Sequence, residues 1–138
     1  MTAKYIWEFG SIIFIILGSI HLVYTFFTNK FLSKNEKVMI EMKSSYPILT
    51  NETTLWKAWI GFNASHSVGA IFIGVINIYL VHSFIVTLEN DLFFFVFNIL
   101  TVGFYLWLAK KYWFKIPFFG ILLTLICYLS AFVITLLT

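Results

Sequence analysis

The chain has 138 residues, of which 61% are hydrophobic and only 11% are charged. Soluble domains contain about 25% charged residues, so this composition excludes an ordinary soluble globular protein and requires a surface that faces lipid. The net charge of +3 comes from lysines that form no nucleic-acid-binding motif, so we expect the lipid bilayer, and no nucleic acid, as a partner.

The chain has four long uncharged runs of apolar residues, Phe9–Phe27, Ala58–Leu88, Leu92–Ala109 and Ile116–Thr138. They predict four membrane-spanning helices, at about 7–27, 58–81, 91–109 and 116–137. Each is close to the roughly 20 residues that cross a hydrocarbon layer of about 30 Å. The second run continues to Leu88, so we expect its helix to project past the membrane near His82. The runs are continuous rather than alternating, which favours helices over a β-barrel. The predicted fold class is therefore all-α, a polytopic membrane four-helix bundle with a single domain at 1–138.

The first loop, residues 28–57, contains a predicted short amphipathic helix. Ser33 and Glu36 have the spacing of a capping box, in which each side chain satisfies a free backbone N–H. Several apolar residues then share one helical face: Phe31, Leu32, Val38, Met39 and Met42. This pattern is typical of a helix that lies on the membrane surface, and a solvated loop is the alternative.

Lysines indicate the orientation of the chain. Loop 28–57 contains five lysines, and the loop between the third and fourth spans contains Lys110, Lys111 and Lys115. The connection at 81–90 contains none. The first and third loops of a four-span protein lie on the same side, so the positive-inside rule predicts that loop 28–57 is cytoplasmic. Both termini then lie outside a bacterial inner (plasma) membrane.

Two histidines are expected at the same depth. His21 precedes Phe27, near the inner end of the first span, by six residues, and His66 follows Trp59, near the inner end of the second, by seven. At about 1.5 Å per residue, both lie roughly 9–10 Å from the inner surface. Opposite chain directions therefore predict that the two imidazoles are level.

Small and polar residues lie at helical spacing on every span, and they predict a polar seam through the bundle. The candidate ligand-binding or seam residues are His21, Asn63, Ser65, His66, Ser67, Asn98, Thr101, Tyr105 and Thr124. Ser11, Ala70, Gly74, Asn77, Gly120 and Cys127 share the same faces. The small-residue pairs Ser65/Gly69 and Ala70/Gly74 also predict that the second span lies at the centre of the bundle, in close contact with its neighbours.

Three interpretations of the histidine pair remain open. Both imidazoles can be neutral and fix helix register through Asn63, Tyr24, Tyr105 or Thr101. The pair can line a pocket for a lipid-like or small polar ligand, because ionisable residues inside a membrane mark functional sites. As an alternative, His21 and His66 can be axial ligands of haem b in a redox membrane protein.

Catalytic chemistry is not indicated. No Asp or Glu lies inside the four uncharged runs to orient a histidine beside a nucleophile, or to complete a metal site. The sequence therefore predicts a non-enzymatic membrane subunit or ligand-binding bundle, either a homo-oligomer or part of a larger membrane complex.

The start of the second span carries a motif. Residues 55–69 read LWKAWIGFNASHSVG and contain W-x(4)-G-F-N-x-S from Trp56 to Ser65. With the Gly18–His21 step late in the first span, this pattern resembles a group of small bacterial four-helix integral membrane proteins. The resemblance covers roughly the first 80 residues. It implies the same architecture, and it carries no activity and no residue roles.

Overall fold

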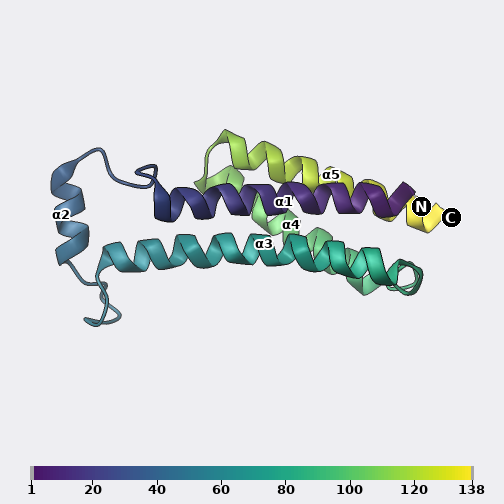
Figure 1. Ribbon diagram of the computed structural model, residues 1–138, viewed down its shortest axis with the longest axis horizontal. Coiled ribbons are helices and arrows are strands. Elements are labelled where there is room, and N and C mark those ends of the chain that lie inside the picture. The colour runs from purple at the N-terminus through teal and green to yellow at the C-terminus, as the bar shows by residue number, and fades with distance from the viewer. Residues whose placement is uncertain (1, 138) are drawn as a thin grey trace. The chain divides into compact units, whose positions relative to one another are not determined.

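The computed structural model describes residues 2–137. Within this range the chain is helical, without strands, and Figure 1 shows its helices: α1 (Thr2–Phe27), α2 (Glu36–Ser44), α3 (Leu55–Leu88), α4 (Leu92–Tyr112) and α5 (Lys115–Leu137). All except α2 are long and apolar enough to cross a membrane. The predicted fold class, a membrane four-helix bundle with a short helix in its first loop, is confirmed.

The described chain divides into two compact units, which are treated separately. The four-helix unit contains the residues up to Leu17 and those from Ala70 onward, so it holds parts of α1 and α3 with all of α4 and α5. The histidine unit is Gly18–Gly69, with the end of α1, all of α2 and the beginning of α3. In the four-helix unit, the first turn of α1 and the last turn of α5 lie at the same end (Figure 1).

Aromatic side chains form the core of the four-helix unit. Ala3, Trp7 and Phe14 are buried at spacings that keep them on one face of α1. The Trp7 ring stacks on Tyr128 of α5, with centroids 3.8 Å apart and planes 4° apart. Phe95 of α4 meets the same indole edge to face at 5.1 Å. Three helices therefore pack around one tryptophan.

Gly74 lets α3 approach α1 closely. A Cβ atom at Gly74 would lie 2.5 Å from Cγ1 of Ile15 and 2.7 Å from the backbone oxygen of Ser11. Real Cβ atoms do not come so close to backbone oxygen, so this crossing requires glycine. The close approach predicted from Ala70 and Gly74 is confirmed at Gly74.

Helix α3 is longer than one membrane crossing. Its 34 residues rise about 50 Å, against a hydrocarbon thickness of about 30 Å. Thr54 precedes the helix, and its Oγ1 accepts a hydrogen bond from the Lys57 amide at 3.3 Å. Near the other end, Phe84 departs from helical geometry with φ −131° and ψ 20°, which marks a kink. The helix thus continues past the predicted span in both directions.

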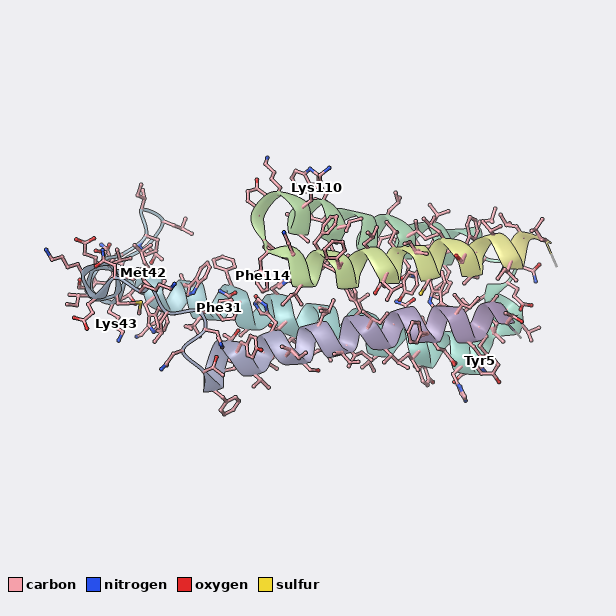
Figure 2. The ribbon with its side chains drawn as sticks, turned by 90° about the horizontal axis from the view of Figure 1, so that it is seen from above. Tyr5, Phe31, Met42, Lys43, Lys110 and Phe114 are labelled. Atoms are coloured by element: carbon pink, nitrogen blue, oxygen red, sulfur yellow. The ribbon has the colours of Figure 1, made fainter. Side chains whose placement is uncertain are left out.

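The predicted capping box of α2 is wrong. Asn35 is the N-cap, and its side-chain oxygen accepts from the Lys37 amide at 3.0 Å. The Ser33 hydroxyl accepts instead from the Asn35 amide at 3.1 Å, so it is used in the turn before the helix. Helix α2 therefore begins at Glu36, and Figure 2 labels Met42 and Lys43, two side chains of this helix.

Candidate functional site

Histidines from α1 and α3 meet in the histidine unit. The ring centroids of His21 and His66 are 5.5 Å apart, with planes at 74°. Nε2 of His21 lies 3.0 Å from Oδ1 of Asn63. The Asn63 amide nitrogen donates to the Trp59 carbonyl at 2.8 Å, which leaves Oδ1 facing His21. Because an amide oxygen only accepts hydrogen bonds, Nε2 of His21 carries the proton.

Aromatic residues flank this cluster of His21, Asn63 and His66, which we call the histidine cluster. The Phe31 ring packs on His21 at 4.7 Å between centroids, and it meets Trp59 edge to face at 6.4 Å. All three members of the cluster are half-buried. The cluster is therefore an open polar patch with an aromatic border, and it is not an enclosed pocket.

The two serines predicted beside the cluster bond within their own helix. Ser67 is buried and donates to the Asn63 carbonyl at 2.7 Å. Ser65 is exposed and donates to the Phe62 carbonyl at 3.1 Å. Back-bonding of this kind satisfies a serine hydroxyl inside a membrane helix without a partner on another helix.

Asn98 belongs to a chain of amide hydrogen bonds in the four-helix unit. The Trp7 indole donates to Oδ1 of Asn77 at 2.9 Å, and Nδ2 of Asn77 donates to Oδ1 of Asn98 at 2.7 Å. Nδ2 of Asn98 then donates to the Phe94 carbonyl at 2.8 Å. These hydrogen bonds link α1, α3 and α4. They satisfy the buried indole N–H of Trp7 and the side-chain amides of Asn77 and Asn98.

Thr124 takes part in a second set of bonds, between α1 and α5. Its hydroxyl lies 3.1 Å from the Gly10 carbonyl oxygen, to which it donates. On the same two helices, the hydroxyls of Ser11 and Tyr128 are 2.7 Å apart. All four of these positions are buried. Helix α1 is thus fixed against α5 by hydroxyl groups and against α3 by an indole.

The remaining candidates, Thr101 and Tyr105, are also in the four-helix unit. Thr101 donates to the Phe97 carbonyl on its own helix at 2.8 Å. The Tyr105 ring packs edge to face on Phe14 at 5.3 Å. The residues predicted as one seam therefore take part in separate sets of contacts, and only His21, Asn63 and His66 form a cluster of ionisable and amide side chains.

Sequence reasoning missed Trp7 and Tyr128, which sit at the centre of the polar contacts in the four-helix unit. Both are aromatic residues in strongly apolar segments, where hydropathy does not distinguish them from their neighbours. A signal was present, because buried indole N–H and phenol O–H groups require hydrogen-bond partners. Ser11 follows Trp7 by four residues, and its hydroxyl donates to the Trp7 carbonyl at 2.9 Å.

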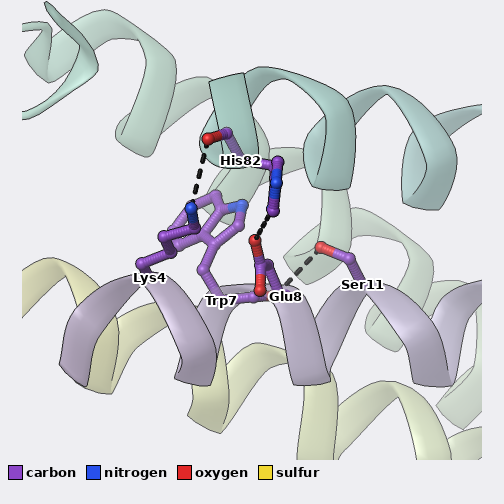
Figure 3. A network of polar contacts seen from close by, with 5 residues as sticks. All are labelled: Lys4, Trp7, Glu8, Ser11 and His82. Carbon is purple, nitrogen blue, oxygen red and sulfur yellow. Dashed lines mark hydrogen bonds and ion pairs between the residues drawn. The ribbon is translucent and has the colours of Figure 1, made fainter. Parts of the chain in front are cut away.

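Figure 3 shows polar contacts between α1 and α3 in the four-helix unit, made by Lys4, Glu8 and His82. Nδ1 of His82 is 3.3 Å from Oε1 of Glu8, and Nζ of Lys4 donates to the His82 carbonyl at 3.1 Å. The His82 side chain is 70% exposed and the Glu8 side chain is 16% exposed, so this contact lies at the surface with its carboxylate partly covered.

Removing the Tyr128 hydroxyl tests the contact between α1 and α5. Tyr128→Phe should lower the free energy of unfolding by about 0.6–1.7 kcal/mol, the range of single interhelical hydrogen bonds in membranes. Tyr79→Phe is the matched control, because the Tyr79 ring is 56% exposed and lacks a buried hydroxyl partner in residues 2–137. Unfolding in mixed micelles should separate the two variants. Equal stabilities would contradict the contact.

The cluster does not fit a haem. Two axial histidines must each present a nitrogen to one iron from opposite faces of a flat macrocycle. The rings of His21 and His66 instead meet edge to face, and Nε2 of His21 is bonded to Asn63. Within residues 2–137, no three His, Cys, Asp or Glu side chains lie close enough together to hold a metal ion.

Comparison with protein-family models, with curated proteins and with solved structures finds no match. A proposal for the function of this chain therefore has to rest on the geometry of the chain itself.

Proposed function

We propose that the protein is a non-enzymatic, ligand-binding protein of the inner (plasma) membrane, and that its histidine cluster holds a lipid-like or small polar ligand. Four helices that can cross a membrane support the multi-pass arrangement. The lysines of loop 28–57 and of the α4–α5 connection support an orientation with both termini outside. The cluster then lies within the inner half of the membrane.

The observation that carries this proposal is the half-exposure of the cluster. In the four-helix unit, Asn77, Asn98 and Thr124 are buried and bonded to other residues. His21, Asn63 and His66 are only half-buried, although apolar residues surround them in sequence. Polar groups exposed to hydrocarbon are costly, so a polar ligand that covers the half-exposed side of the cluster would lower this cost.

The chemistry of the cluster favours an amphiphilic ligand. His21 uses Nε2 as a donor to Asn63, which orients the imidazole and places His66 beside it. Phe31 and Trp59 border the cluster with aromatic rings, and Trp59 is 42% exposed. Tryptophan side chains are enriched at the level of lipid headgroups. A ligand with a hydrogen-bonding head and an apolar body matches both features.

Mass spectrometry of the protein extracted from its native membrane tests the proposal. The wild type should retain one small molecule at fixed stoichiometry, and His21→Ala and His66→Ala should each reduce retention by about tenfold, the effect of one lost hydrogen bond of about 1.4 kcal/mol. Ser65→Ala, on the same turn of α3 as His66, should retain the ligand fully. The four proteins should unfold within about 1 kcal/mol of each other.

Other outcomes contradict the proposal. Equal retention by all four proteins means that the cluster binds nothing. Loss of stability in the histidine variants without any retained molecule means that the pair only fixes helix register. A stoichiometric protein partner that covers the cluster makes the chain a subunit instead. A Soret band that disappears in both histidine variants would point to haem.

A further inference from the structure

A hollow in the four-helix unit lies where α4 connects to α5. Its volume is about 360 Å³, and Lys110, Lys115, Trp113, Phe114 and Phe119 contribute to its lining. Figure 2 shows Lys110 and Phe114 at this connection, in which only two residues separate the helices. Binding sites for small molecules have volumes of about 300–1,000 Å³, so the hollow has room for a headgroup and not for a whole lipid.

Two cations face this hollow without acidic neighbours in sequence. Lys110 and Lys115 are exposed, and no Asp or Glu occurs after Asp91. The third lysine of the connection is directed elsewhere, because Nζ of Lys111 lies 5.3 Å from the centroid of Trp107 and 5.2 Å from that of Tyr112. Two positive charges, those of Lys110 and Lys115, therefore line the hollow.

Helix geometry adds to this positive field. Helix α5 begins at Lys115, and the N-terminus of a helix of 23 residues carries a partial positive charge. Around the same hollow, Phe114 is 58% exposed and Phe119 is 61% exposed. Lys110 and Lys115 can bind a phosphate, and the exposed rings of Phe114 and Phe119 can contact apolar chains. A phosphate attached to apolar chains therefore fits this hollow better than a free anion.

We propose that this hollow binds the headgroup of an anionic phospholipid, with the phosphate between Lys110 and Lys115 and the acyl chains beside Phe114 and Phe119. Basic pockets at the ends of membrane helices bind acidic headgroups in this way. The Lys111 side chain, held over its aromatic neighbours, stays outside the site. This lipid site is independent of the histidine cluster.

Titration of the full chain with phosphatidylglycerol, followed by native mass spectrometry from zwitterionic micelles, tests the site. Lys110→Gln and Lys115→Gln should each weaken binding about fivefold, as expected from about 1 kcal/mol for the loss of one solvent-exposed cation paired with the phosphate, and the double variant about 25-fold. Lys111→Gln is the matched control, with the same charge change in the same connection. It should weaken binding less than about twofold, because Lys111 lies over Trp107 and Tyr112 and does not line the hollow.

Three results would overturn the site. Equal losses in all three lysine variants mean that only general surface charge attracts the lipid. Phosphatidylcholine binding as tightly as phosphatidylglycerol means that the hollow does not select for negative charge. Displacement of the lipid by millimolar inorganic phosphate means that the hollow is a site for a free anion.

Discussion

Trp7→Ala is expected to lower the free energy of unfolding by about 3–5 kcal/mol, the cost of truncating a large aromatic side chain in a packed core. The substitution removes the stack on Tyr128 and the edge contact with Phe95. It also removes the donor to Oδ1 of Asn77, which is 2% exposed. Reversible unfolding in mixed micelles, followed by circular dichroism, measures the loss.

Two further variants separate packing from hydrogen bonding at this position. Trp7→Phe keeps most of the ring contact and loses only the indole N–H, so it should cost about 1–2 kcal/mol. Trp107→Ala removes a tryptophan that is 48% exposed, and it should cost less than about 1 kcal/mol. If Trp7→Ala and Trp107→Ala were equally stable, Trp7 would not be the centre of the core.

Gly74→Val is expected to prevent the close crossing of α1 and α3 in the four-helix unit. The new Cβ would lie 2.7 Å from a backbone oxygen, that of Ser11, which cannot rotate away as a side chain can. The helices must then separate, at a cost of about 1–3 kcal/mol or more, as for other overpacked cores. The yield of folded protein and its unfolding midpoint measure the effect.

Gly103→Val is the matched control, because both glycines lie inside long helices and share the same change in helix propensity. A Cβ at Gly103 meets no heavy atom within 4 Å. Gly103→Val should therefore fold as well as the wild type. Similar losses at Gly74 and Gly103 would show that helix propensity, and not the helix crossing, determines the effect.

The helices could be predicted from sequence because hydropathy and length constrain membrane spans strongly. A run such as residues 116–137 has to form its backbone hydrogen bonds internally once it is in lipid, which leaves only a helix. The capping of α2 was not predictable in the same way. Ser33 and Asn35 are both residue types that cap helices well. Asn35 became the N-cap of α2, because the Ser33 hydroxyl accepts a hydrogen bond from the Asn35 amide in the turn before the helix.

The candidate site was predictable in part. Opposite chain directions placed His21 and His66 at one level, and their rings are in contact. The sequence could not show that Asn98 bonds to Asn77 and Thr124 to Gly10, away from the histidines. The rotation of each helix about its axis determines these contacts, and it depends on packing that a single sequence does not specify. The role of the cluster in binding a ligand stays a prediction.

The proposed ligand site depends on a chain that crosses the membrane four times with its histidines near the lysine-rich side. Single cysteines in a Cys127→Ala background test this directly through labelling with a membrane-impermeant maleimide. In intact cells the reagent should label Glu89→Cys, and it should reach Lys43→Cys and Lys111→Cys only after permeabilisation. Labelling of Lys43→Cys in intact cells, or opposite sides for residues 43 and 111, would contradict the arrangement.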